Sequence, residues 1–129
     1  MRTTSRHVLA ELYDCNNHVL DDVATIRLHM LATARLIGAT VVGEVFHRFS
    51  PCGVTGVVVI AESHLCVHTW PESSYVAMDI FTCGGLDPIP GISFFAEAVG
   101  ARQYRVQEIL RGLSADLDSQ VYSSLDNHN

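Results

Sequence analysis

The sequence predicts an α+β fold, a layered sandwich in which helices pack on one face of a mostly antiparallel sheet. Short apolar segments typical of strands recur along the chain, most connections between them are short, and one longer segment has apolar residues at helical spacing. The 129 residues, 48% of them hydrophobic, are enough for one domain with a core and too few for two. We therefore predict a single domain over residues 1–113.

The longer segment, residues 19–37, is the clearest helix. Its apolar residues recur at helical spacing, Asp21 and Asp22 stand in the predicted first turn, and Gly38 follows as a stop signal. A second, short helix is expected after the Gly/Pro loop 84–91. The remaining apolar segments are predicted strands, at residues 7–13, 39–49, 54–70, 75–82 and 103–109. The short helix is predicted at residues 92–99. The polar tail that follows the last strand, residues 114–129, is expected to be disordered.

Composition excludes several classes of protein. The formal net charge is -6 and the eight basic residues are scattered, which disfavours nucleic-acid binding. No apolar run is long enough to span a membrane, and the N-terminal segment lacks the features of a signal peptide. The four cysteines, at 15, 52, 66 and 83, form no C-x-x-C pair, which is typical of reduced thiols in a cytoplasmic protein.

The segment 54–70 is too long for one strand, so the chain must reverse direction within it. The only polar interruption is Glu62-Ser63-His64, which contains none of the Gly, Asn or Asp residues that tight hairpins favour. Two interpretations remain open on this pattern alone. The turn is strained, as functional sites often are, or it is an ordinary longer loop that carries an ordinary serine.

The same region carries long, gap-free motifs. The runs Glu62-Ser63-His64-Leu65, Val67-His68-Thr69-Trp70-Pro71-Glu72 and Asp79-Ile80-Phe81-Thr82-Cys83-Gly84 resemble the prokaryotic S-adenosylmethionine decarboxylases. Phe46-His47-Arg48-Phe49 and Gly53-Val54-Thr55-Gly56 fit as well, and the resemblance covers roughly residues 6–112. It implies the layered sandwich of that family, no metal, and a homodimer of processed protomers with residues of both subunits at each site.

Decarboxylation of an α-amino acid requires an electron sink, which no standard side chain provides. The resemblance implies that Ser63 supplies one as a covalent pyruvoyl group, whose carbonyl forms a Schiff base with the substrate. The Ser63 hydroxyl would attack the Glu62 carbonyl, the amide would become an ester, and β-elimination would separate residues 1–62 (beta chain) from 63–129 (alpha chain). Dehydroalanine left at position 63 would then hydrolyse to the pyruvoyl group.

The resemblance also assigns roles to three further residues. His68 is the proton acceptor of self-cleavage, Cys83 the proton donor to the substrate carbon, and Thr55 a processing hydroxyl where many relatives have serine. From the residues alone, a solvent-facing strand histidine, a small buried thiol and a β-branched strand residue are open alternatives.

Phe49 and Glu72 are the candidate substrate-binding residues. An aromatic face stacks adenine or attracts a sulfonium, and a carboxylate accepts two hydrogen bonds from a ribose diol. A core phenylalanine and a solvated glutamate are the alternatives. Glu11 and His7 are expected near the site.

The predicted function is decarboxylation of S-adenosylmethionine to the aminopropyl donor of spermidine and polyamine biosynthesis. One alternative is decarboxylation of L-ornithine or L-arginine on the same scaffold. Another is an unprocessed, non-enzymatic regulatory paralogue. A third is a zinc module, since His64, Cys66 and His68 share one strand face with Trp70 and Cys83 could add a ligand.

Overall fold

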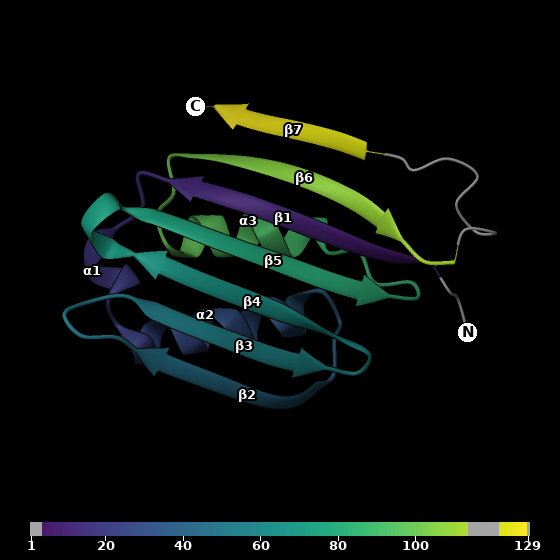
Figure 1. Cartoon of the computed structure of the whole chain (residues 1–129), viewed down its shortest axis with the longest axis horizontal. Helices are drawn as coiled ribbons and strands as arrows, with labels where there is room; N and C mark the ends of the chain where they lie inside the picture. The colour runs from purple at the N-terminus through teal and green to yellow at the C-terminus, as the bar shows by residue number, and fades with distance from the viewer. Residues whose placement is uncertain (1–3, 114–121, 129) are drawn as a thin grey trace.

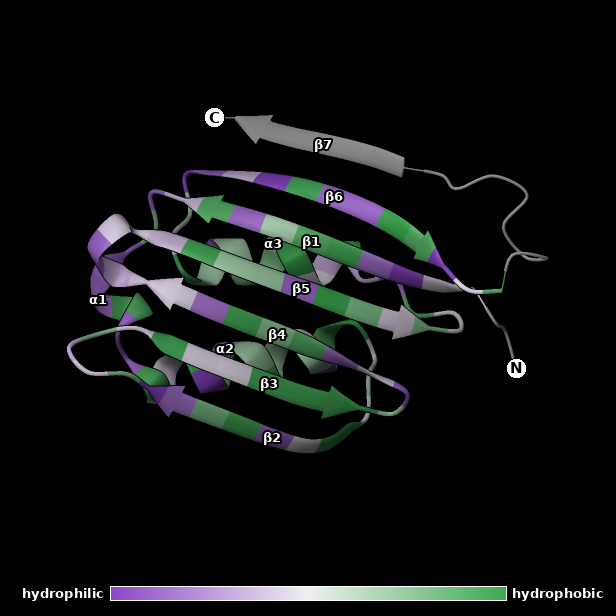
Figure 2. Cartoon of the chain, in the orientation of Figure 1, coloured by the Kyte–Doolittle hydropathy of each residue, from purple (hydrophilic) through white to green (hydrophobic). Residues whose placement is uncertain are grey.

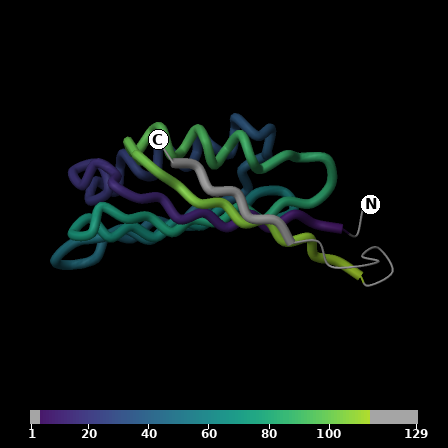
Figure 3. Tube along the Cα trace, turned by 90° about the horizontal axis from the view of Figure 1, so that it is seen from above, coloured from purple at the N-terminus to yellow at the C-terminus, as the bar shows by residue number. Residues whose placement is uncertain are grey.

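A computed structural model describes residues 4–113 and 122–128. It contains one seven-stranded sheet of order β2-β3-β4-β5-β1-β6-β7, in which every neighbouring pair is antiparallel. The helices lie on one side of this sheet, which confirms the predicted fold class (Figures 1 and 3). In chain order the strands are β1 (Ser5–Tyr13), β2 (Val41–Arg48), β3 (Val54–Ile60), β4 (Ser63–Trp70), β5 (Tyr75–Cys83), β6 (Gln103–Arg111) and β7 (Tyr122–His128).

Apolar and polar residues alternate along several strands, because successive side chains point to opposite faces of the sheet (Figure 2). On β4, Leu65, Val67 and Thr69 are buried under the helices, whereas His68 and Trp70 on the other face are exposed. None of the described helices is long and apolar enough to cross a membrane. The helices are α1 (Asn17–Leu20), α2 (Val23–Leu36), the 3-10 turn η1 (Pro71–Ser73) and α3 (Ile89–Ala98).

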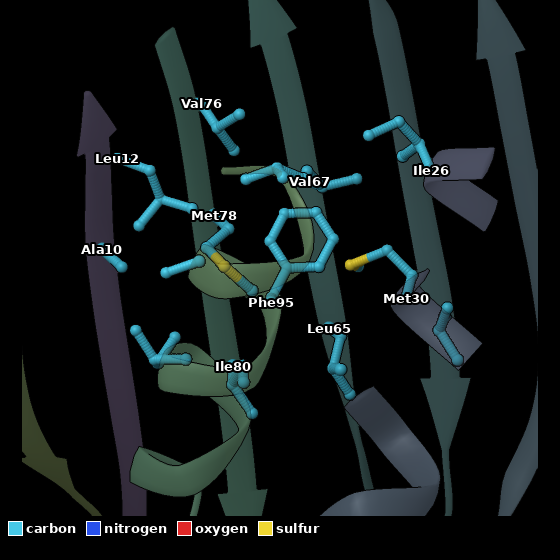
Figure 4. Close-up of a cluster of buried hydrophobic side chains, with 14 of the residues drawn as sticks. Ala10, Leu12, Ile26, Met30, Leu65, Val67, Val76, Met78, Ile80 and Phe95 are labelled. Carbon is cyan, nitrogen blue, oxygen red and sulfur yellow. The ribbon is translucent and has the colours of Figure 1, made fainter. Parts of the chain in front are cut away.

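The core lies between the sheet and the two longer helices. Phe95 of α3 points toward Val67 and Met78 of the sheet, and Met30 of α2 lies beside it (Figure 4). Phe95, Val67 and Met30 are fully buried, and burial of each such side chain stabilises the fold by about 1.5–3 kcal/mol. The other face of the sheet has no covering layer among the described residues, and we refer to it as the open face.

The single helix predicted over residues 19–37 is in fact two helices. Asp22 caps the start of α2, because its carboxylate accepts a hydrogen bond from the Thr25 backbone N–H at 3.2 Å. Asp21 leaves the helical conformation as well and binds Arg48 and Gly53. Aspartate favours such caps because its short side chain competes for backbone N–H groups, and this effect outweighed the apolar periodicity.

The prediction of a disordered tail is wrong for Tyr122–His128. These residues form β7, which pairs antiparallel with β6 from Gln103↔His128 to Ile109↔Tyr122. The main chain of β6 would otherwise be an unpaired sheet edge, and backbone pairing does not require apolar side chains. The rest of the predicted tail, residues 114–121 and 129, lies outside the described residues.

Candidate active site

The β3–β4 hairpin carries the proposed cleavage bond. Ile60 pairs with Ser63, so the turn consists of Ala61 and Glu62, and the Glu62 N–H donates to the Ile60 carbonyl oxygen at 2.9 Å. The predicted reversal inside residues 54–70 is therefore confirmed. Glu62 has φ of 158°, close to extended backbone, so this tight turn is made without glycine.

Cys83 lies directly against the bond between Glu62 and Ser63. Its Sγ is 3.5 Å from the Glu62 carbonyl oxygen and 4.0 Å from the Ser63 Oγ. The buried Ser5 hydroxyl is 3.1 Å away on the other side, because Ser5 and Cys83 are register partners of β1 and β5. A hollow of about 440 Å³ opens beside Glu62 and Cys83. Two residues 20 apart in sequence, Ser63 and Cys83, thus share one site.

Thr55 and His68 form a second group on the open face. They are register partners of β3 and β4, and Thr55 Oγ1 lies 3.1 Å from His68 Nδ1. His68 lines a hollow of about 340 Å³ together with Glu11, which accepts a hydrogen bond from the Tyr75 hydroxyl at 2.7 Å. Burial, reinforced by Glu11, raises the pKa of Tyr75, so the phenol stays protonated.

The two groups lie at opposite ends of the sheet. His68 follows Ser63 by five residues on one strand, which at about 3.3 Å per residue places it about 16 Å away. In Figure 1 the β3–β4 turn and the end of β5 lie at one end of the strands, and η1 and the β2–β3 connection lie at the other end. One protomer therefore does not bring His68 to Ser63.

Phe49 and Glu72 lie at the His68 end. The Phe49 ring is 47% exposed, which excludes a core phenylalanine, and it packs edge-on against His47 at 4.5 Å between ring centroids. The Glu72 carboxylate is 3.6 Å from the Cys52 thiol and lines a broad hollow of about 610 Å³. An aromatic face and an exposed carboxylate are thus both accessible at this end.

Asp21 is a residue of this region that sequence reasoning missed. Its carboxylate accepts from Arg48 Nη2 at 2.7 Å and from the Gly53 N–H at 3.0 Å, so it fixes the connection that carries Phe49. The hydrogen bond from Arg48 holds the pKa of Asp21 below its usual range. The sequence offered no signal, because Asp21 resembled a first-turn aspartate of a helix.

The ligands of the alternative zinc module are not brought together. His68 hydrogen-bonds to Thr55, whereas His64 Nε2 lies 3.0 Å from Asp79 Oδ2, and burial raises the pKa of the Cys66 thiol to about 11. In the described part of the chain, the one cluster of three potential ligands is instead His64 and Asp79 with His7, and the sequence analysis missed it.

Comparisons with known proteins point to one family. Residues 6–112 match the S-adenosylmethionine decarboxylase family. The S-adenosylmethionine decarboxylase proenzyme of Fervidobacterium nodosum is 48% identical over 113 residues, which cover 87% of this chain and 82% of the relative. That of Syntrophomonas wolfei is 43% identical over 126 residues, covering 97% and 100%.

A solved structure has the same fold. The crystal structure of the adenosylmethionine decarboxylase from Aquifex aeolicus aligns with a TM-score of 0.79 at 29% identity and covers 88% of this chain and 94% of that one. A family match over most of the chain, close relatives of similar length and a shared fold lead to one conclusion. The chain belongs to the S-adenosylmethionine decarboxylase family.

Proposed function

We propose that this chain is an S-adenosylmethionine decarboxylase proenzyme that cuts itself between Glu62 and Ser63 and carries a pyruvoyl group at position 63. Its product is the aminopropyl donor of polyamine biosynthesis. The observation that carries the proposal is the Cys83 thiol, which contacts both the Glu62 carbonyl and the Ser63 hydroxyl in a chain of this family. The named relatives give no support to ornithine or arginine decarboxylation or to a regulatory paralogue.

Self-cleavage needs only groups at the hairpin and one proton acceptor. Ser63 Oγ attacks the Glu62 carbonyl carbon, the C–N bond breaks, and the Glu62 acyl group moves to oxygen as an ester. Removal of the Ser63 Cα proton expels the Glu62 carboxylate and leaves dehydroalanine at position 63. The dehydroalanine tautomerises to an imine, which water hydrolyses to the pyruvoyl group with release of ammonia. The Cys83 thiol faces the attacked carbonyl oxygen at 3.5 Å and can donate to it.

The pyruvoyl group supplies the electron sink for the carbanion left when CO2 departs. We assign the return of a proton to that carbon to Cys83, and the 4.0 Å between its thiol and the Ser63 hydroxyl supports this assignment. Ser5 restricts the thiol from the opposite side at 3.1 Å.

The site is completed by a second copy of the chain. Ser63 and Cys83 are about 16 Å from the Thr55–His68 pair within a protomer, too far for direct proton transfer. A two-fold arrangement of two open faces would set one protomer's His68 against the other's Ser63. The open face is suited to burial because it exposes apolar side chains on four strands: Leu9, Val45, Val59 and Trp70 are 38%, 71%, 44% and 41% exposed.

The substrate chemistry fits the same arrangement. Phe49 and Glu72 lie at the His68 end, so the dimer would bring them toward the Ser63 of the partner. The exposed Phe49 ring offers a face for adenine or the sulfonium, and the Glu72 carboxylate can accept from the ribose diol.

A cytoplasmic location stays a prediction.

Two measurements test the proposal. Intact-mass analysis should give fragments 1–62 and 63–129, the second without a free amine and reactive toward carbonyl reagents, whereas Ser63→Ala should stay whole. The cleaved protein should then release CO2 from S-adenosylmethionine but not from L-ornithine or L-arginine, offered side by side. A chain that remains uncut on long incubation, or that turns over only the amino acids, would refute it.

A further inference from the structure

Three side chains from three strands meet on the open face beside the cleavage site. Asp79 Oδ2 of β5 lies 2.8 Å from His7 Nε2 of β1 and 3.0 Å from His64 Nε2 of β4. All three are partly buried, with 23%, 19% and 34% of their side chains exposed. None of them has a role in the chemistry described above, although His64 directly follows Ser63.

Arg111 determines which nitrogen of the His7 ring donates a hydrogen bond. Its Nη1 lies 3.3 Å from His7 Nδ1, and its guanidinium stacks 4.9 Å from the centre of the Phe81 ring. Because a guanidinium only donates, His7 Nδ1 must accept, and the His7 proton stands on Nε2, facing Asp79. A metal ion would need the Nε2 lone pair of His7, so the contacts favour a hydrogen-bonded cluster.

The cluster crosses the cleavage bond. His7 belongs to fragment 1–62, whereas His64 and Asp79 belong to fragment 63–129. After the cut, the only covalent attachment of the group at position 63 is the amide of His64. Chain ends that nothing ties down fray, and His64 is the first side chain able to hold this one.

We propose that His7, Asp79 and His64 form a clamp that holds the pyruvoyl-bearing end of the cleaved chain, with Asp79 as the positioning residue that ties it to the other fragment. This inference rests on the proposed function. Before the cut, the peptide bond between Glu62 and Ser63 fixes the same end covalently, so the clamp contributes little. After the cut, Asp79 restricts the motion of His64 and hence the position of the reactive carbonyl relative to Cys83.

The test compares the same substitution in cut and uncut protein. Asp79→Ala and His7→Phe, which keeps the ring packing but loses the donor, are each made in the parent and in the uncut Ser63→Ala background. At equal protein concentration, each substitution should lower the Tm of the cut protein by about 4 °C or more beyond the loss that it causes in the uncut protein. In the cut protein kcat should fall about 10-fold with KM within about twofold, because a misplaced reactive group slows the chemical step rather than binding.

The matched control is Glu44→Ala, which removes an ion pair with Arg27 that lies wholly inside fragment 1–62. It should lower the Tm equally in both backgrounds and leave kcat unchanged. Asp79→Asn retains an acceptor oxygen and should restore part of kcat. Equal Tm losses in cut and uncut protein, or loss of cleavage in both clamp variants, would overturn the clamp alone. A parent protein that stays whole would overturn the proposed function with it.

Discussion

Mixing two inactive chains tests whether each site is built from two protomers. Ser63→Ala lacks the nucleophile and His68→Ala lacks the proposed proton acceptor, so each homodimer should fail to process, the second by about 10²–10⁴-fold in rate. In a mixed dimer one of the two sites combines Ser63 of the His68→Ala chain with His68 of its partner. That site is complete, whereas the other lacks both groups.

The expected yield follows from random pairing. Equal amounts of the two chains, co-expressed or refolded together, give homodimers and mixed dimers in a ratio of about 1:2:1. About half of the His68→Ala chains therefore have a Ser63→Ala partner and should be cut rapidly, and all of the Ser63→Ala chains should remain whole. Intact-mass analysis with a tag on one chain separates the two populations.

The matched control replaces the partner with a chain that carries both Ser63→Ala and His68→Ala. Such dimers contain no His68, so the rapid phase should vanish. The distance of about 16 Å along β4 is the basis of this prediction, because a side chain cannot bridge it within one protomer. If the His68→Ala chains stay whole beside Ser63→Ala partners, or are cut at the same rate without any partner, the shared site is wrong.

Three further outcomes follow from the geometry. Cys83→Ala should still be cut, since Ser63 remains, but should turn over slowly or give a wrongly protonated product, detectable by mass spectrometry of the product; full activity would assign the proton to another donor. Glu72→Gln should raise KM for S-adenosylmethionine by the equivalent of roughly 1–3 kcal/mol with kcat and cleavage unchanged, measured by steady-state kinetics; an unchanged KM would remove Glu72 from the site. Asp21→Ala should raise KM as well, by releasing the connection that carries Phe49. Arg48 holds the pKa of Asp21 below its ordinary value of 3.8. The stability that Asp21 adds is therefore present above pH 3.8 and is lost as the pH falls toward the lower pKa of the folded state. In acid denaturation monitored by circular dichroism, the stability difference between the parent and Asp21→Ala should shrink over this range.

Much of the fold could be predicted because the signals are local. The apolar segments mark six of the strands, and the length of 54–70 requires the hairpin whose turn proved to be Ala61-Glu62. Cys83 was expected at the end of its strand, and β5 ends there. Local capping could have separated α1 from α2, since Asp22 followed by Thr25 is compatible with a helix start.

The parts that could not be predicted depend on register between strands distant in sequence. His7, His64 and Asp79 meet because His7 and His64 both pair with Phe81, on either side of β5, which sets them beside Asp79 on the same face. The split between Ser63 and His68 has a different origin. Both lie on β4, five residues apart, so their separation follows from the strand that the sequence already predicted after the hairpin turn. The pairing of Tyr122–His128 with β6 depends on backbone groups, which composition does not reveal.

The position of the proposed cut explains how the fold could survive it. The bond between Glu62 and Ser63 lies in a two-residue turn, and neither strand beside it depends on that turn alone: β3 is also paired with β2, and β4 with β5. The proposed fragment 1–62 supplies β1 to the interior of the sheet, where β5 and β6 of the other fragment flank it. Cleavage there would remove one covalent link and no ladder of the sheet. It would free a chain end at the site while the sheet keeps Cys83 beside it, which is the condition a backbone-derived cofactor requires.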